Sequence, residues 1–290
     1  MMKHLIALMR PKQWLKNLFV LLPLFFSGRM MDVLCWNKVV WAAIAYSLAA
    51  SSIYVLNDLI DAEADRRHPE KCKRPIASGC VKGRQALWLA AICMVLALAV
   101  MGLLVNMQSM AVIAVYCVLN IGYCLKLKQI AVLDILIVSS GYVLRLLVGS
   151  YATGVVLSQW IVLMTFLLAL FLALAKRRDD VLIYENDGIQ TRGTVLQYNL
   201  PFINASMSVM AAVMVVCYLM YTVSPEVTQR LHTSHLYLTS LFVIAGVLRY
   251  MQIAFVSQQS GSPTRVLSHD VFIQLCVLGW VLTFAAIIYC

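Results

Sequence analysis

The sequence predicts an all-α polytopic membrane protein, a bundle of about nine transmembrane helices. Hydrophobic residues make up 62% of the 290 residues, charged residues only 12%, and the mean hydropathy is +0.84. Soluble domains contain roughly 45–50% apolar and about 25% charged residues. This composition excludes a soluble α/β enzyme, a DNA-binding domain and a secreted disulfide scaffold.

The predicted spans follow from apolar runs, because crossing a bilayer requires about 20 mainly apolar residues. The runs that qualify lie at 14–31, 39–57, 86–105, 109–125, 131–149, 158–175, 201–223, 236–255 and 271–290. The first is the weakest, since its apolar part is short and Arg29 follows closely. Because no low-complexity tract interrupts the chain, we expect residues 1–290 to form a single integral membrane domain.

The basic residues predict the orientation. With the N-terminus inside, 18 of the 23 Lys and Arg residues fall on the inner side and three on the outer side. Cytoplasmic loops of membrane proteins carry such an excess. We therefore expect an inner (plasma) membrane protein with a cytoplasmic N-terminus. The long charged segments 58–85 and 176–200 then place the active site on the cytoplasmic side.

An acidic cluster follows the second span. At 100° per residue, Asn57, Asp58, Asp61 and Asp65 share one arc of a helix. Clustered hard oxygens suit Mg²⁺, which typically takes one or two carboxylates plus phosphate oxygens. The alternative interpretation is a solvated helix end that pairs with neighbouring arginines. The position at a membrane boundary favours the metal site.

A basic segment comes next and contains Arg67, Lys73 and Arg74. Two interpretations stay open: an anchor for anionic lipid headgroups, or a clamp for phosphates facing the metal site. Pro75 and Gly79 predict an ordered turn rather than a floppy tail.

Lys176, Arg177 and Asp180 close the sixth span. An arginine can bind phosphate oxygens in bidentate fashion, but it cannot bind a metal. The alternative is an ordinary positive-inside helix end. Tyr123 and Lys126 share a face at the end of the fourth span.

Two further ionisable residues lie at or within the fifth span. Asp134 begins it, either as a metal ligand or as an acid favoured by the helix dipole. Arg145 lies deeper in the same span, where it either meets a lipid phosphate or pairs within the bundle.

The motif Asn-Asp-x-x-Asp-x-x-x-Asp, followed by Arg-Pro-x-x-x-Gly, resembles the UbiA superfamily of membrane prenyltransferases, nine-helix proteins in which this motif binds Mg²⁺ and a substrate diphosphate. Other stretches resemble one branch, the decaprenyl-phosphate (polyprenyl-phosphate) phosphoribosyltransferases. They are residues 10–17, 123–134, 139–145, 158–160 and 176–177. Aromatic prenyltransferases of the superfamily usually carry an aspartate where this chain has Arg177, which disfavours that activity.

The resemblance implies Mg²⁺-dependent transfer of a 5-phosphoribosyl group from phosphoribosyl diphosphate to a polyprenyl phosphate, with no nucleic-acid partner. The implied metal ligands are Asn57, Asp58, Asp61, Asp65 and Asp134. The implied catalytic residues are Asp58, Asp61, Lys126 and Lys176. The implied substrate-binding residues are Lys16, Asn57, Arg67, Lys73, Arg74, Tyr123, Arg145, Arg177 and Asp180. The alternatives are prenyl transfer from a diphosphate to a small acceptor, and a transporter, which the boundary position of the ionisable residues disfavours.

Overall fold

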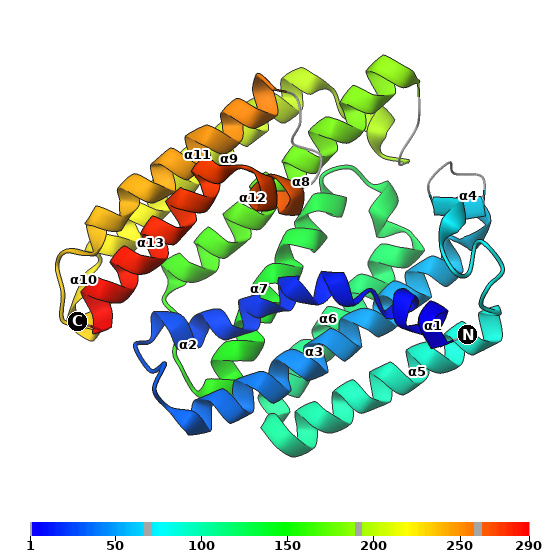
Figure 1. Ribbon diagram of the computed structural model, residues 1–290, viewed down its shortest axis with the longest axis horizontal. Coiled ribbons are helices and arrows are strands. Elements are labelled where there is room, and N and C mark those ends of the chain that lie inside the picture. The colour runs from blue at the N-terminus through cyan, green and yellow to red at the C-terminus, as the bar shows by residue number, and fades with distance from the viewer. Residues whose placement is uncertain (1, 67–70, 189–192, 258–262, 290) are drawn as a thin grey trace. The chain divides into compact units, whose positions relative to one another are not determined.

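The computed structural model describes residues 2–66, 71–188, 193–257 and 263–289. Over these ranges the chain is helical and has no strand, which confirms the predicted all-α class (Figure 1). Within the described ranges, eight helices are long and apolar enough to cross a membrane. They are Val33–Ile60, Gly83–Val105, Met107–Leu125, Leu133–Thr153, Gln159–Asp187, Leu200–Val223, Leu236–Phe255 and Val271–Ile288. Each corresponds to one of the predicted spans after the first.

The first predicted span, 14–31, is not a single long helix. It contains most of the 3₁₀ helix η1 (Pro11–Leu21) and the short helix α2 (Leu22–Phe26). Pro11 and Pro23 each stand in the first turn of one of these helices. Proline has no N–H to donate to a preceding turn, so it begins helices readily and interrupts continuous ones.

The chain forms two compact units. The first comprises Met1–Lys128 and Val143–Leu157. Besides η1 and α2, its elements are α1 (Met2–Met9), α3 (Val33–Ile60), α4 (Ala62–Arg66), the 3₁₀ turn η2 (Lys71–Lys73), α5 (Gly83–Val100), the π-helical η3 (Met101–Val105), α6 (Met107–Leu125) and the second part of α7 (Leu133–Thr153).

Helix α3 is the centre of the first unit and packs against α5, α6 and η1. Its buried face is built from small residues, including Ala42, Ala45 and Ala49. Small side chains allow helix backbones to approach closely within a membrane. The Ser52 hydroxyl accordingly donates to the Ala90 carbonyl of α5 over 2.8 Å.

Polar caps and one glycine set the ends and spacing of these helices. The Asp32 carboxylate accepts from two N–H groups of the first turn of α3, and the Asn106 side chain caps α6. Such caps satisfy N–H groups that have no partner within the helix. On α7, a β-carbon at Gly149 would overlap the Val20 carbonyl of η1, so only glycine permits this approach.

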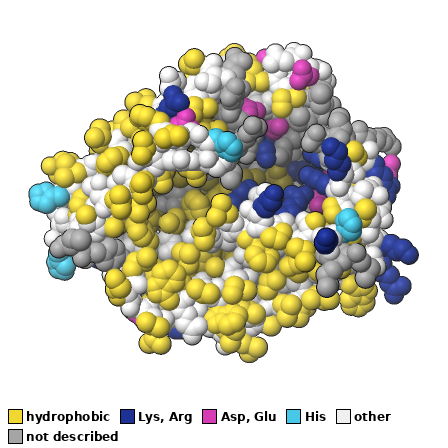
Figure 2. All heavy atoms as spheres, in the orientation of Figure 1, with side chains coloured by type: hydrophobic (Ala, Val, Ile, Leu, Met, Phe, Trp, Pro, Cys, Tyr) yellow, Lys and Arg dark blue, Asp and Glu magenta, His cyan; other side chains and the backbone are white. Residues whose placement is uncertain are grey.

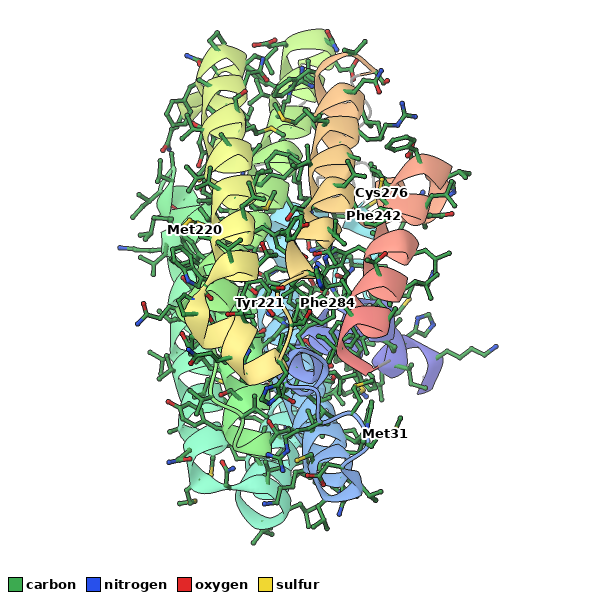
Figure 3. The ribbon with its side chains drawn as sticks, turned by 90° about the vertical axis from the view of Figure 1, so that its left-hand side faces the viewer. Met31, Met220, Tyr221, Phe242, Cys276 and Phe284 are labelled. Atoms are coloured by element: carbon green, nitrogen blue, oxygen red, sulfur yellow. The ribbon has the colours of Figure 1, made fainter. Side chains whose placement is uncertain are left out.

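The second unit comprises Gln129–Tyr142 and Ser158–Cys290. It holds part of the 3₁₀ turn η4 (Leu127–Gln129), the first part of α7, α8 (Gln159–Asp187), η5 (Val195–Gln197), α9 (Leu200–Val223), α10 (Pro225–Leu231), η6 (Leu236–Thr239), α11 (Ser240–Phe255), α12 (Pro263–His269) and α13 (Val271–Tyr289). Helix α8 packs along α9, and α11 packs along α13. Phe242 of α11 lies against Gly279 of α13, where an added β-carbon would come within 2.5 Å of the ring. Figure 3 shows Phe242 beside Cys276 of the same helix pair.

Helix α8 continues well beyond the predicted end of its span at residue 175. It stops at Asp187, where Gly188 adopts a left-handed conformation (φ 68°) and caps the helix. The segment 176–187, expected as the start of a loop, is therefore helical. Arg177 and Arg178 are buried in it because other helices of the second unit supply polar partners.

Large apolar side chains remain exposed along the long helices of both units, among them Leu96 and Val118. Figure 2 shows hydrophobic side chains over much of the visible surface, with Lys and Arg gathering at the end of the first unit where α1 and α4 lie. Lipid covers such surfaces in helical membrane proteins.

Candidate active site

The predicted acidic cluster forms where α3 ends. Asp58 lies in the last turn of α3, Asp61 caps the helix, and Asp65 lies in α4. The Asp61 N–H donates to the Asn57 carbonyl over 2.9 Å, and the Asp65 N–H donates to the Asp61 carbonyl over 2.8 Å. These bonds keep the backbone close to a helical path through the junction. Asp58 and Asp65 are buried, with exposed fractions of 3% and 4%.

Basic side chains reach all three carboxylates. Arg74 Nη1 donates to Asp58 Oδ1 over 3.0 Å and to Asp65 Oδ2 over 2.7 Å. Arg10 Nη2 reaches the same Asp58 oxygen over 2.5 Å. Lys128 Nζ lies 2.5 Å from Asp61 Oδ1. Positive charge thereby offsets the repulsion and the desolvation of the acids.

The turn that carries Arg74 is fixed at both ends. The Arg74 carbonyl accepts a hydrogen bond from the Ser78 N–H over 2.8 Å. Gly79 has a φ of 78°, a left-handed value that favours glycine. Ile76 and Val81 anchor the turn in an apolar cluster with α3 and α5. This arrangement agrees with the predicted ordered turn. Arg74 is thus held by a rigid loop.

Among the predicted basic residues that the structure describes, Arg74 contacts the acids, whereas no contact to them is seen for Lys126, Lys73 or Lys16. Lys126 caps α6 and its side chain is exposed, whereas Lys128 contacts Asp61. Lys73 is also exposed, and Lys16 is half-buried. Tyr123 packs against the apolar core of the first unit. Arg67 lies outside the described residues.

Sequence reasoning assigned no role in the site to Arg10 or Lys128. Both are distant in sequence from the acids that they contact. Arg10 stands in one of the stretches that carry the family resemblance, which was the available signal for it. Lys128 lies in another such stretch, residues 123–134, but only the fold shows which of its two lysines contacts Asp61.

Arg145 lies within the first unit, where it is 5% exposed. Its Nε donates to Asn17 Oδ1 over 2.8 Å, and its guanidinium carbon lies 4.9 Å from the Tyr46 ring centroid and 5.5 Å from that of Tyr116. An amide oxygen and two π-faces stabilise a cation in an apolar interior. Arg145 therefore pairs within the bundle, and its role in binding the lipid phosphate stays a prediction.

A second polar cluster lies in the second unit around Asp134, which is fully buried at the start of α7. Arg177 Nε donates to Asp134 Oδ2 over 2.7 Å, and Arg177 Nη1 donates to Asp180 Oδ2 over 3.1 Å. The Tyr198 hydroxyl donates to Asp134 Oδ1 over 2.8 Å and accepts the Val132 N–H over 2.7 Å. Both Asp134 oxygens therefore accept from protein donors.

Burial and the neighbouring Asp134 carboxylate raise the pKa of Tyr198 to about 12, so its hydroxyl keeps its proton at neutral pH. Sequence reasoning did not find this tyrosine, because nothing in the sequence relates it to an acid so far away in the chain. Lys176 is exposed on α8. The roles of Lys176, Arg177, Asp180 and Asp134 in binding ligands stay predictions.

The chemistry of the first unit's acidic cluster fits a divalent cation. Within the described ranges, no group of three His, Cys, Asp or Glu side chains is arranged to hold a metal ion by itself. Mg²⁺ commonly takes only one or two carboxylates and completes its shell with water and phosphate oxygens. Asp58, Asp61 and Asn57 supply hard oxygens of that kind at one helix end. A cation at Asp58 or Asp61 would share these carboxylates with Arg10 and Lys128.

Comparison with known proteins identifies the architecture. The model of the UbiA prenyltransferase family matches residues 19–288. The chain belongs to this family. It is therefore a multi-pass membrane transferase, in agreement with its apolar helices. The predicted resemblance is confirmed.

Relatives and solved structures cover nearly the whole chain. A decaprenyl-phosphate phosphoribosyltransferase from Mycolicibacterium smegmatis is 36% identical over 98% of this chain and 92% of its own length. A protein of the same name from Corynebacterium glutamicum is 32% identical over 98% of this chain and 86% of its own length. A UbiA homolog from Archaeoglobus fulgidus, solved bound to GPP and Mg²⁺, superposes with a TM-score of 0.72 at 18% identity, covering 99% of this chain and all of that one. This last likeness supports the UbiA fold.

Proposed function

We propose that this protein transfers a 5-phosphoribosyl group from phosphoribosyl diphosphate to a polyprenyl phosphate and releases diphosphate. The observation that carries the proposal is the 36% identity, over 98% of the chain, to a decaprenyl-phosphate phosphoribosyltransferase. The acidic cluster and its basic partners supply groups that this chemistry needs, since both substrates carry phosphate groups and a diphosphate must leave.

The proposed metal is Mg²⁺, held by Asn57, Asp58 and Asp61, with Asp65 next to them. When bound, it would neutralise the donor diphosphate and make it a better leaving group. Asp65 also holds Arg74, whose guanidinium would bind phosphate oxygens of the donor. Arg74 and Lys128 contribute positive charge that is already oriented before the reaction begins.

The reaction itself requires no strong base. The bond between ribose C1′ and the diphosphate oxygen breaks, with both electrons leaving on the diphosphate. A bond forms between C1′ and an oxygen of the lipid phosphate, which is already ionised near neutral pH. Positive charge develops on the ribose during the transfer, and the site holds the leaving anion while it departs. Electrostatic positioning is therefore the main contribution of the protein.

We further propose that the acidic cluster faces the cytoplasm. The support is the asymmetry of the basic residues, with 18 on the N-terminal side and three on the other. A polar donor is then available from the aqueous side, while the polyprenyl chain stays in the lipid.

A donor comparison tests the proposal. Purified protein in detergent is given a polyprenyl phosphate with labelled phosphoribosyl diphosphate and Mg²⁺, and the lipid fraction is analysed for label. A parallel reaction supplies a prenyl diphosphate with a small aromatic acceptor, since the family name favours this as the second candidate. Label in the lipid fraction supports phosphoribosyl transfer. Prenyl transfer without phosphoribosyl transfer would overturn it.

A further inference from the structure

Arg10 has an unusual backbone conformation next to the acidic cluster. Its φ and ψ are 52° and 59°, in the left-handed region that residues other than glycine rarely occupy. Pro11 follows directly, and a residue before proline favours an extended conformation. Strain of this kind persists where surrounding contacts enforce it, often at functional sites.

A ladder of hydrogen bonds enforces the conformation by fastening the segment 9–17 along α3. The Ser51 hydroxyl donates to the Met9 carbonyl over 2.9 Å and accepts from the Trp14 indole over 3.0 Å. Asn17 Nδ2 donates to the Ser47 hydroxyl over 2.8 Å. Ser47 and Ser51 are one helical turn apart, and the acidic cluster lies at the C-terminal end of the same helix. The ladder therefore fixes the base of the Arg10 side chain relative to Asp58.

Arg10 and Arg74 share one carboxylate oxygen, Asp58 Oδ1. Arg74 has a second acid, Asp65, at 2.7 Å. Across the described ranges, the only carboxylate paired with Arg10 is Asp58, and its guanidinium also lies 5.3 Å from the Tyr54 ring centroid. The Arg10 side chain is 28% exposed, so it has room to change partner.

We propose that Arg10 is a donor-binding residue, which pairs with Asp58 and moves to a donor phosphate oxygen when Asp58 binds a divalent cation. This inference rests on the proposed function. A divalent cation on Asp58 would compete with Arg10 and Arg74 for the charge of this carboxylate, and like charges repel. Arg10 has the fewer other partners and leaves. Tyr54 keeps it beside the acidic cluster, where the diphosphate brings new acceptors.

Arg10→Gln tests both the competition with the cation and the binding of the donor, because it should strengthen the first interaction of the protein, with the cation, and weaken the second, with the donor. Removing the competing cation should strengthen Mn²⁺ binding without donor, measured by electron paramagnetic resonance on purified protein. The same change should raise the KM for phosphoribosyl diphosphate about tenfold to a hundredfold, the usual loss for a charge-assisted hydrogen bond. Arg10→Lys should restore part of the donor affinity. A merely structural role would weaken metal and donor binding together.

Two further variants keep the test decisive. Arg29→Gln removes an exposed arginine that pairs with Asp32 in the same unit. It should change neither the Mn²⁺ affinity nor the KM for the donor. Arg10→Gly relieves the backbone strain, so a donor KM as high as that of Arg10→Gln in a stably folded protein assigns the effect to the guanidinium. Unchanged Mn²⁺ affinity in Arg10→Gln would overturn the exchange, whichever donor the enzyme uses. An unchanged KM for the donor that the wild type accepts would overturn the binding role, whereas failure to use phosphoribosyl diphosphate would overturn only the proposed function.

Discussion

Arg177 Nε lies 2.7 Å from Asp134 Oδ2, and both side chains are buried within the second unit. Removing one partner of a buried ion pair leaves a charge without compensation, which typically costs about 3–5 kcal/mol. We therefore expect Arg177→Ala to lower the unfolding temperature of the purified protein strongly. Adding Asp134→Asn should recover part of the loss, and a double-mutant cycle measures the coupling.

Arg249 provides a control for that experiment. It pairs with Asp270 in the same unit, but its side chain is 36% exposed, and exposed ion pairs contribute little to stability. Arg249→Ala should shift the unfolding temperature little. If Arg177→Ala were equally mild and instead raised the donor KM, Arg177 would be a phosphate ligand, as its position in the sequence predicts.

Arg177→Asp separates the two candidate reactions. If the enzyme transfers phosphoribosyl groups, Arg177→Asp should lower the activity more than Arg177→Ala does, because it adds a third acid beside Asp134 and Asp180. In aromatic prenyl transfer, an aspartate restores the motif expected of that activity. Assays of the folded variant with both donors therefore distinguish the two reactions by whether the activity falls or rises. An active Arg177→Asp enzyme that uses a prenyl diphosphate would contradict the proposed function.

Lys128 and Lys126 give opposite predictions despite their proximity in sequence. Lys128 lies 2.5 Å from Asp61 Oδ1, whereas Lys126 is exposed. If the structure identifies the functional lysine, Lys128→Met should lower kcat/KM for the donor more than Lys126→Met does. Steady-state kinetics on the two purified variants decides between them. Equal or reversed losses would restore the sequence-based choice of Lys126.

Apolar runs predicted the long helices well, because membrane insertion imposes both their length and their composition. The end of α8 was not predictable in the same way. Residues 176–187 are charged, but they continue the helix, and Arg178 is buried against Asn204 of α9. Only tertiary partners show that this polar segment is packed.

The acidic motif could be recognised from the sequence because its spacing alone places the side chains on one helix face. Its basic partners were harder to identify. Arg74 follows the motif closely and was predicted, whereas Arg10 and Lys128 reach the acids from distant segments. Contacts over such sequence separations depend on how η1 and the end of α6 pack beside α3. That packing follows from the whole unit, not from a local motif.

Asp270 predicts a pH dependence of stability outside the acidic cluster. Hydrogen bonds from Arg249 lower the pKa of its carboxyl group. A depressed folded-state pKa stabilises the protein above the unfolded-state pKa of about 3.9, and this contribution is lost as the pH falls through the folded value. Asp270→Asn keeps a cap for the Ile273 N–H but removes the charge. The difference in unfolding temperature between wild type and variant should be constant from about pH 7 to pH 5 and shrink below about pH 4; a gap that widens in acid would contradict this.

The proposed topology predicts the accessibility of two exposed positions. Lys82 precedes α5, in a segment expected to be cytoplasmic, and Gln229 lies in α10, in a segment expected to be external. In a background without the native cysteines, a membrane-impermeant thiol reagent applied to intact cells should label Gln229→Cys and spare Lys82→Cys. Permeabilised cells should show labelling at both positions. Labelling of Lys82→Cys alone in intact cells would invert the topology.

The metal assignment predicts that Asp58→Asn and Asp61→Asn each abolish Mg²⁺-dependent turnover while the protein stays folded. A neutral amide is a poor ligand for a hard divalent cation, and the loss leaves fewer carboxylates at the helix end. Asp32→Asn is a matched control, because asparagine still caps α3 and the contacts that it alters, to Arg29 and to the Cys35 thiol, lie outside the acidic cluster. Activity is measured against Mg²⁺ concentration, with Mn²⁺ binding as a second readout. Near wild-type activity of an Asp58 or Asp61 variant at limiting Mg²⁺ would exclude that residue as a metal ligand. An equal loss of activity in Asp32→Asn would show that the effect is not specific to the acidic cluster.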